Sequence, residues 1–229
     1  MDQRGTKFQA SGEGEVAWQT KADAAYYRLR DRVIDGRLAP GSNLDQEALA
    51  RQIGLSTTPV REALRRLEAD GLVIQKAHST IRVPELSKRE FNELYGIRML
   101  LDPEAARLAC RSADRVACDA VRSILRTAEA EEESEIGPLD RLRINRRFHR
   151  AIYARCGSDT MVTLLDTLWD RCDRYRLQLL KDDEAVDVAD AQHHDMLEAF
   201  CDGKEDLLAQ LVREHLQGSY DRLIDLLSQ

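Results

Sequence analysis

The chain has 229 residues and a formal net charge of −7, with 43% hydrophobic and 33% charged residues. This composition suits a folded, helix-rich globular protein and excludes an intrinsically disordered chain. No apolar run is long enough to cross a bilayer, and the N-terminus has no signal-peptide core, so we expect a cytoplasmic protein without a membrane partner.

The cysteines are odd in number and scattered, with no C-x-x-C pair among Cys110, Cys118, Cys156, Cys172 and Cys201. Secreted disulfide frameworks and zinc–thiolate sites show regular cysteine spacing instead. We therefore expect reduced, packed thiols.

The charges are unevenly distributed along the chain. Residues 21–85 hold eleven Lys/Arg against nine Asp/Glu, whereas residues 86–229 hold 21 against 29. A slightly basic N-terminal part on an acidic body is compatible with nucleic-acid binding at one end only.

The first predicted elements follow a polar, aperiodic stretch, residues 1–19, which we expect to be a flexible tail. A helix is predicted over 21–35 from the apolar stripe of Ala25, Leu29 and Val33. A Pro-Gly turn follows at 40–41, and a second short helix is predicted over 45–54, between an Asp and a Gly.

A third helix is predicted in "TPVREALRRLEADG", with Thr58 as N-cap, Pro59 as first helical residue and Gly71 as the stop. Its apolar residues recur at helical spacing, which leaves Arg61 and Arg65 together on the outer face. The next segment, "LVIQKAHSTIRV", has two β-rich runs around a polar turn and predicts a hairpin.

Two short helices around a tight turn, followed by a hairpin, form the pattern of a winged helix-turn-helix over residues 20–85. Its second helix would enter the DNA major groove, where arginine can donate two hydrogen bonds to guanine. The alternative is an ordinary helix pair with solvated arginines.

The stretch "GRLAPGSNLDQEALARQIGLSTTPVREALRRLEADGLV" closely resembles the DNA-binding domain of the GntR family of bacterial transcription regulators. The resemblance implies contacts with double-stranded operator DNA for Thr57, Thr58, Arg61, Arg65 and, in the wing, His78 and Ser79. Thr57 stands where the family usually has a basic residue, and the wing tip lacks the glycine that the family often has. We therefore expect a changed operator preference.

Beyond Pro84 the sequence predicts helices only. "SKRE" is a capping box of Ser87 with Glu90, and helices are predicted over 87–111, 114–134, 138–156, 159–181, 188–201 and 204–228. The fold class is therefore mainly α, with the winged helix-turn-helix followed by an all-helical domain over residues 86–229.

Three segments of this second part resemble the FCD-type ligand-binding domain of the FadR subfamily. They are "SKREFNELYGIRMLLDPEAARLAC", "NRRFHRAIYARCG" and "HDMLEAFCDGKEDLLAQLVREH". The resemblance implies an effector-binding and dimerisation domain, and hence a homodimer that reads a pseudo-palindromic operator.

Three of the five histidines, His149, His193 and His215, lie on apolar faces of three different predicted helices. Neutral imidazoles that converge in a bundle core are good ligands for a divalent transition metal. The alternative is three ordinary core histidines.

By resemblance, the ligand set of the family maps onto Asn145, His149, His193 and His215. Asn145 stands where the family more usually has Asp, and an amide oxygen ligates without a negative charge, so a lower affinity or a different metal is expected. His194 is turned by about 100° from His193 on a helix, so His193 is preferred. Zinc is the first expectation, with nickel, iron and manganese as alternatives.

Arg98 lies on an inward stripe with Phe91, Leu94 and Tyr95, an unusual place for a permanent cation unless it meets an anion. The alternative is an i,i+4 salt bridge with Asp102. The resemblance favours Arg98 as a contact for a small carboxylate effector, with Arg174 as a second candidate.

The leading hypothesis is a ligand-responsive transcription regulator, expected to be a repressor, that binds a small organic acid at a metal centre. A metal-dependent hydrolase is disfavoured because no H-E-x-x-H motif occurs and a catalyst has no use for a DNA-binding domain. Two further alternatives are a regulator for which the ion itself is the signal, and one in which the metal is purely structural.

Overall fold

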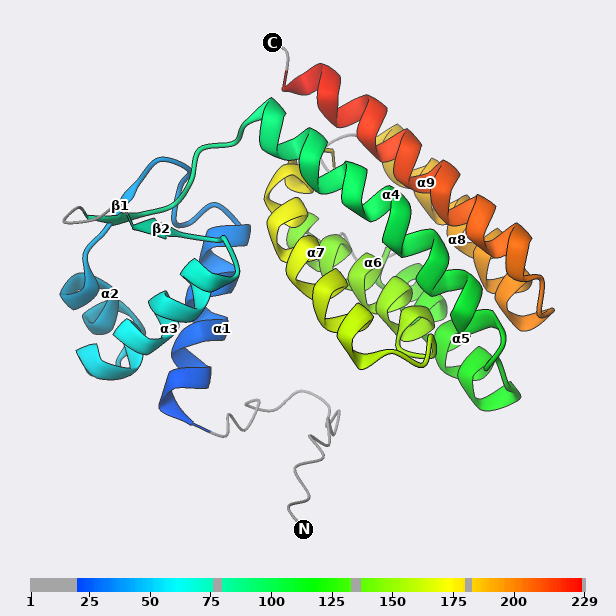
Figure 1. Cartoon of the computed structure of the whole chain (residues 1–229), viewed down its shortest axis with the longest axis horizontal. Helices are drawn as coiled ribbons and strands as arrows, with labels where there is room; N and C mark the ends of the chain where they lie inside the picture. The colour runs from blue at the N-terminus through cyan, green and yellow to red at the C-terminus, as the bar shows by residue number, and fades with distance from the viewer. Residues whose placement is uncertain (1–19, 76–79, 133–136, 180–182, 228–229) are drawn as a thin grey trace.

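The computed structural model describes residues 20–75, 80–132, 137–179 and 183–227. Figure 1 shows two groups of elements joined by an extended linker: a small mixed domain at the N-terminal end and a helical bundle. The mainly-α prediction is confirmed for these residues. The proposed tail, residues 1–19, and the wing residues His78 and Ser79 lie outside them.

The small domain holds three helices and a three-stranded sheet, which are α1 (Lys21–Ile34), β1 (Asn43–Leu44), α2 (Gln46–Ile53), α3 (Thr57–Ala69), β2 (Ile74–Gln75) and β3 (Ile81–Arg82). β3 is central and antiparallel to both of its neighbours. The predicted hairpin is thus confirmed. β1 was not predicted, because two residues are too few to show the alternation of a strand.

Helix α3 starts earlier than the sequence indicates. Ser56 is its N-cap residue and Thr57 its first helical residue, so Thr58 is not the cap. Pro59 does not mark the start because every backbone N–H of a first helical turn lacks an intrahelical acceptor, so that proline is tolerated throughout it. Val60, Ala63, Leu64 and Leu67 are buried as predicted.

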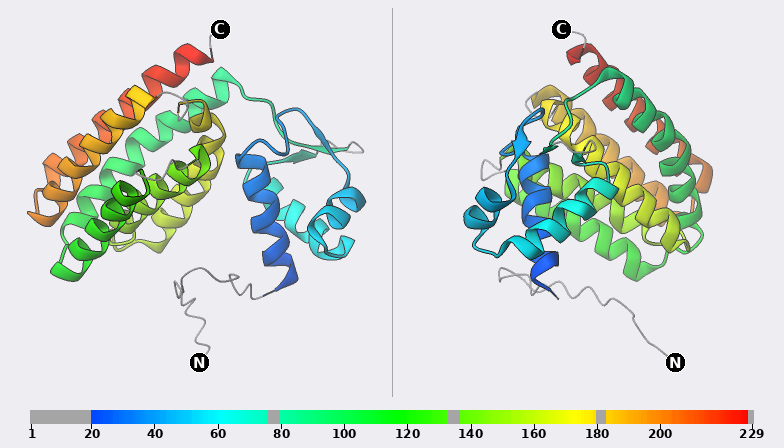
Figure 2. Two further views of the ribbon diagram at one scale, coloured as in Figure 1. Left: turned by 180° about the vertical axis from the view of Figure 1, so that it is seen from behind. Right: turned by 60° about the vertical axis from the view of Figure 1, so that its left-hand side comes forward.

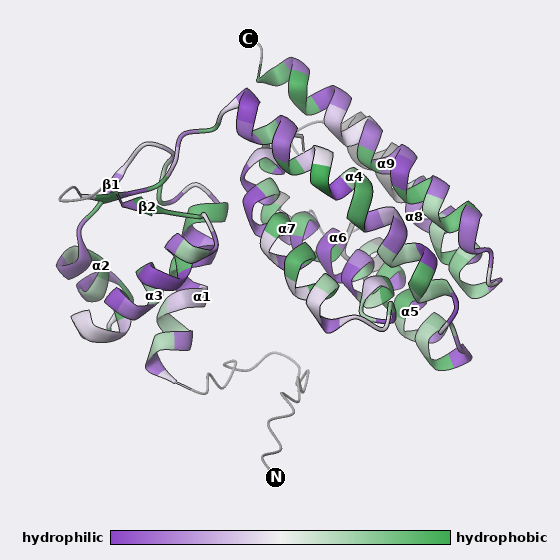
Figure 3. Ribbon diagram, in the orientation of Figure 1, coloured by the Kyte–Doolittle hydropathy of each residue, from purple (hydrophilic) through white to green (hydrophobic). Residues whose placement is uncertain are grey.

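The bundle consists of α4 (Lys88–Cys110), α5 (Arg115–Glu132), α6 (Pro138–Tyr153), α7 (Asp159–Leu179), α8 (Asp183–Cys201) and α9 (Glu205–Leu226). These bounds agree with the predicted helices to within five residues at each end. α4 and α9 run side by side along one face (Figures 1 and 2). Both domains have separate hydrophobic cores, and most helices carry alternating polar and apolar stripes in Figure 3.

The capping box at the start of α4 forms only in part. The Ser87 hydroxyl accepts the N–H of Glu90 at 3.1 Å, as predicted. The Glu90 carboxylate instead accepts hydrogen bonds from Arg171 at 2.6 Å and from Tyr175 at 2.8 Å, both on α7. Charged partners from α7 therefore take the side chain that the motif assigns to the helix end.

Helix α7 forms most of the contact between the two domains. Arg30 of α1 pairs with Asp170 through two hydrogen bonds of 2.6 and 2.5 Å. The Arg171 guanidinium lies against Gly71, where a Cβ atom would come within 3.1 Å of its Nε. Arg174 donates to the carbonyl of Pro84 in the linker. Helix α7 of the bundle thus contacts the N-terminal domain and the linker at several points.

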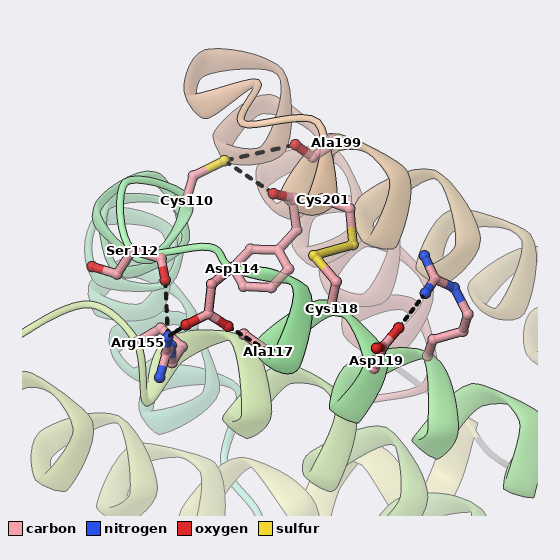
Figure 4. Close-up of a disulfide and its surroundings, with 11 residues drawn as sticks. Cys110, Ser112, Asp114, Ala117, Cys118, Asp119, Arg155, Ala199 and Cys201 are labelled. Carbon is pink, nitrogen blue, oxygen red and sulfur yellow. Dashed lines mark hydrogen bonds and ion pairs between the residues drawn. A yellow bond between two sulfur atoms is a disulfide. The ribbon is translucent and has the colours of Figure 1, made fainter.

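The expectation of reduced thiols is wrong for one pair of cysteines. Cys118 of α5 and Cys201 of α8 form a disulfide (Figure 4). Their Cα atoms are 5.6 Å apart, although 83 residues separate them in the sequence. This proximity arises from the packing of α5 on α8, which residue spacing cannot reveal. Cys110, Cys156 and Cys172 are free and buried, as expected.

No helix within the described ranges is both long and apolar enough to span a bilayer.

Candidate metal centre and DNA-contact surface

Three helices bring His149, His193 and His215 together inside the bundle. The side chains come from α6, α8 and α9 and are all buried. One ring nitrogen from each lies within 4.8 Å of the other two. The Nε2 atoms of His149 and His193 are 3.2 Å apart. The convergence predicted from three separate apolar faces is therefore present in the fold.

Neighbouring side chains fix the orientation of the imidazoles. Nδ1 of His215 is 2.8 Å from the amide oxygen of Gln192, and Nδ1 of His149 is 3.4 Å from the Tyr153 hydroxyl. In His149 this leaves Nε2 facing His193, and in His215 it leaves Nε2 as the nitrogen that could bind a metal. Such outer contacts are typical of metal-ligating histidines, because they set the tautomer and the ring plane.

The histidine cluster favours neutral imidazoles. Burial lowers the pKa of His149 well below its usual value, and the neighbouring His193 and His215 lower it further. Burial and His193 lower the pKa of His215 in the same way. Neutral imidazole is the form whose nitrogen lone pair can bind a metal.

The donor set fits a divalent transition metal. For metal–nitrogen bonds of about 2.0–2.1 Å, two ligand nitrogens are expected to lie roughly 2.9–3.4 Å apart at octahedral to tetrahedral angles. The 3.2 Å between the Nε2 atoms of His149 and His193 falls in this range. Three imidazoles leave at least one coordination position for another ligand.

Asn145 lies one helical turn before His149 on the same face of α6 and is also buried. Its Nδ2 atom has no hydrogen-bond partner among the described residues. A buried amide that makes no hydrogen bond through its nitrogen is costly, and such groups in proteins usually meet a ligand or water. Asn145 thus has the place on α6 of the fourth ligand in the predicted set, which would bind through its amide oxygen, and its unpaired Nδ2 could donate to an oxygen of a bound ligand.

Three other buried donors of the bundle lack a hydrogen-bond acceptor within the part of the chain that the structure describes: Tyr95 Oη, Trp169 Nε1 and Arg176 Nη1. The Trp169 ring lies 5.2 Å from that of His149, centroid to centroid, and the Arg176 guanidinium lies 5.3 Å from the Trp169 ring centre. Unused donors beside a metal-binding cluster suit a ligand rich in oxygen acceptors.

Arg98 forms the buried ion pair with Asp102 that the sequence offered as the alternative interpretation, with an N–O distance of 2.8 Å. Its guanidinium also lies 4.4 Å from the centre of the Trp169 ring. Arg98 is therefore beside the centre but already has an anionic partner. Its role as an effector contact stays a prediction.

Arg174 is directed at the linker rather than at the histidines. It donates to Pro84, and its electrostatic neighbours are Glu90, Tyr175 and Arg171. The sequence prediction did not include Arg176, although its positive charge lowers the pKa of both His149 and His215. The signal in the sequence was its spacing of i+7 from Trp169 on the inward face of α7.

A small pocket opens next to the centre between α6 and α7, lined by Arg146, Arg150, Tyr153, Val162, Leu165, Asp166 and Trp169. Tyr153 and Trp169 both contact the His149 ring. The two arginines of this pocket are ion-paired, Arg146 with Asp170 and Arg150 with Asp166, so the entrance carries charges of both signs.

The predicted DNA contacts on α3 lie on one exposed surface: Thr57, Thr58, Arg61 and Arg65. No ion pair within the described ranges involves Arg61 or Arg65. Arg66, by contrast, is held by Asp23 at 2.7 Å and lies over the Tyr26 ring. The two outward arginines are thus available for bases or phosphates.

Comparison with protein families matches both domains. Residues 21–83 match the bacterial regulatory proteins of the gntR family, and residues 93–218, more than half of the chain, match the FCD domain. The chain belongs to the GntR regulators with an FCD domain. This confirms the family resemblance and the predicted fold class, in which a helix-turn-helix domain is followed by an all-helical domain.

Relatives of this GntR regulator are named as transcription regulators. The Nta operon transcriptional regulator of Aminobacter aminovorans is 29% identical over 82% of this chain and 87% of its own length. The regulator McbR of Escherichia coli is 28% identical over 88% of this chain and 86% of its own length. The E. coli McbR/YncC structure shares the fold, with a TM-score of 0.80 over 91% of this chain and 99% of that one. The protein is therefore a transcription regulator of the GntR type, with a DNA-binding domain and an FCD domain.

Proposed function

We propose that this regulator changes its affinity for operator DNA when a small carboxylate binds at a metal centre formed by Asn145, His149, His193 and His215. The main support for this proposal is that three buried imidazoles converge in the FCD domain, with nitrogens within 4.8 Å of one another. Zinc is the first metal to test, because nitrogen ligands and an open position suit it well.

The carboxylate is inferred from charge and donor chemistry. Neutral imidazoles and an amide leave the charge of a divalent ion uncompensated, and an anionic ligand would balance it. The donors of Trp169, Tyr95 and Arg176 that have no acceptor among the described residues would meet the oxygens of such a ligand. Arg98 and Arg174 remain further candidate contacts.

On DNA, the protein would act in the cytoplasm as a homodimeric repressor of the FadR subfamily, with two α3 helices on a pseudo-palindromic operator. Exposed apolar side chains on the adjacent helices α4 and α9, namely Ile97, Leu100 and Leu207, support an interface between two copies. Effector binding then needs only to favour one arrangement of the two DNA-binding domains.

The test begins with selection of genomic fragments by the full-length protein. Fluorescence anisotropy of a selected fragment is then measured with zinc-loaded protein and lactate, malate, citrate or gluconate. We expect at least one carboxylate to change the Kd by roughly fivefold or more, and the change to be absent in His149→Ala that circular dichroism shows to be folded.

Two results would contradict the proposal. A response to zinc alone, with no further effect of any carboxylate, would make the ion the signal. An undiminished carboxylate response in His149→Ala would separate effector binding from the histidine cluster.

A further inference from the structure

Buried charges connect the histidine cluster with helix α1 of the DNA-binding domain. Arg30 of α1 binds both oxygens of Asp170 on α7. Asp170 Oδ1 also accepts a hydrogen bond from Nη1 of Arg146 on α6, and the same Nη1 donates to Asp173 at 3.3 Å. Asp173 in turn lies 3.5 Å from Arg176. We call these five side chains the arginine–aspartate chain.

The arginine–aspartate chain is shielded from water. The side chains of Asp170, Asp173 and Arg176 are each at most 7% exposed, and those of Arg30 and Arg146 are 15% and 17% exposed. Charges in such surroundings interact strongly and are weakly screened by salt. A change at one member therefore alters the balance of forces on the next.

The charge balance is weakest at the end near the histidines. Arg30 and Arg146 have additional partners in Asp31 and Asp166. Among the described residues Arg176 has only the 3.5 Å ion pair with Asp173, and its Nη1 makes no hydrogen bond there. Burial raises the pKa of Asp173 despite its two arginine neighbours. Arg176 also lies near the Trp169 ring that contacts His149.

The other end reaches the DNA-reading helix. Arg30 is on α1, and the Ala25 and Leu29 side chains of α1 belong to the same core as Leu64 of α3. The Tyr26 hydroxyl donates to Asp70 at the end of α3 at 2.7 Å. A change in how firmly Arg30 is held thus acts on the position of α3.

We propose that Arg176 receives the carboxylate of the effector and that the arginine–aspartate chain transmits this event to α1. This inference rests on the proposed function. When an anion neutralises Arg176, Asp173 draws Arg146 more fully to itself. Asp170 then accepts hydrogen bonds from Arg30 alone, and the Arg30–Asp170 pair holds α1 more tightly on α7.

The alternative is that the five charges only join the two domains. In that case removal of Arg176 would leave α1 unaffected, because Arg176 touches neither α1 nor its partner Asp170 directly within the described interactions.

A double-mutant cycle on the full-length protein distinguishes transmission through the arginine–aspartate chain from a purely structural role. The measurement is amide hydrogen exchange of residues 24–34. Arg176→Gln imitates neutralisation, and we expect it to slow exchange in α1 by about threefold or more. Asp173→Asn frees Arg146 to compete for Asp170, so we expect faster exchange, a change of opposite sign. Arg176→Lys, which keeps the charge, should resemble the wild type.

The cycle also includes two matched backgrounds. The effect of Arg176→Gln should vanish in Asp170→Asn and persist in Asp166→Asn, since Asp166 pairs with Arg146 and Arg150 but not with Arg30. Unchanged α1 exchange in Arg176→Gln and Asp173→Asn, or an equal effect in the Asp170→Asn background, would overturn transmission through the chain.

A second arm tests the binding role of Arg176 by calorimetric titration of citrate into zinc-loaded protein. We expect Arg176→Gln to weaken citrate binding about tenfold or more while zinc stays bound, with Arg122→Gln on α5 as a control that behaves like the wild type. Undiminished citrate binding by Arg176→Gln would overturn this inference alone. Absence of both zinc and citrate binding in the wild type would overturn the proposed function and the inference with it.

Discussion

At the scale of single residues, Asn145 decides the charge of the candidate metal centre. Its amide can offer an oxygen but no negative charge, and its nitrogen makes no hydrogen bond to any described residue. The three histidines add no charge when neutral. In the proposed ligand set, Asn145 would therefore leave the full charge of the ion to be balanced by a bound anion.

Replacement of Asn145 by Asp should strengthen zinc binding and weaken the demand for an anion. We expect a zinc Kd lower by about tenfold or more, since a carboxylate adds Coulomb attraction in a buried site. Competition with a chromophoric chelator measures the change, with Asn145→Ala as the control that should bind no better than the wild type. Equal affinity of the Asp variant and the wild type would exclude residue 145 from the ligand set.

Arg176 shows where residue-level prediction from the sequence stops. The three histidines stood out because they are few and lie on apolar faces, and the fold brings them together. Arginines are many in α7, and helical spacing alone could not tell Arg176, which lies near the centre, from Arg174, which binds Pro84. That distinction depends on which helices pack on each side of α7.

At the scale of elements, α3 carries the proposed DNA contacts on a surface that its own packing leaves free. Helical periodicity predicted the buried side of α3 correctly. The precise start of the helix was not predictable, because proline fits any position of a first turn. The exposed residues Arg61 and Arg65 follow from the same periodicity.

Substitution of Arg61 by Ala should weaken binding to a selected operator fragment by roughly tenfold or more, as loss of a base or phosphate contact does. Fluorescence anisotropy at fixed salt measures the Kd. Arg122→Ala on α5, which removes a partly exposed arginine from the other domain, is the control for the loss of one positive charge. Equal weakening in both variants would mean that only net charge matters.

The disulfide between α5 and α8 should stabilise the bundle. A cross-link between cysteines 83 residues apart is worth about 4.5 kcal/mol in the chain-entropy model, and disulfides typically contribute roughly 2–4 kcal/mol. Reductant should therefore lower the unfolding midpoint by roughly 5–10 °C, as followed by circular dichroism. The double variant Cys118→Ser/Cys201→Ser should melt at the reduced midpoint with or without reductant; a wild-type midpoint that ignores reductant would argue against the bond.

At the scale of the whole molecule, two separate cores are joined by α7 and a short linker. The bundle core consists of apolar residues from all six of its helices, so its folding does not depend on an ion in the way that a small zinc finger does. The helices and both cores could be predicted from the sequence. The arginine–aspartate chain could not, because it needs the placement of α1 against α6 and α7.

Metal removal should therefore leave the fold intact. We expect chelator-treated protein to keep its far-ultraviolet circular dichroism, with only a lower midpoint from the loss of ligand stabilisation. The difference in midpoint should disappear in His193→Ala. Collapse of the helical signal on chelation would instead assign the metal a purely structural role.

The most direct test of the metal centre is the metal content of the purified protein after passage over a weak chelating resin. Elemental analysis should find about one transition-metal ion per chain in the wild type and nearly none in His149→Ala. Equal metal content in the two proteins, or none in the wild type, would contradict the centre and leave the three histidines as core residues or direct effector contacts.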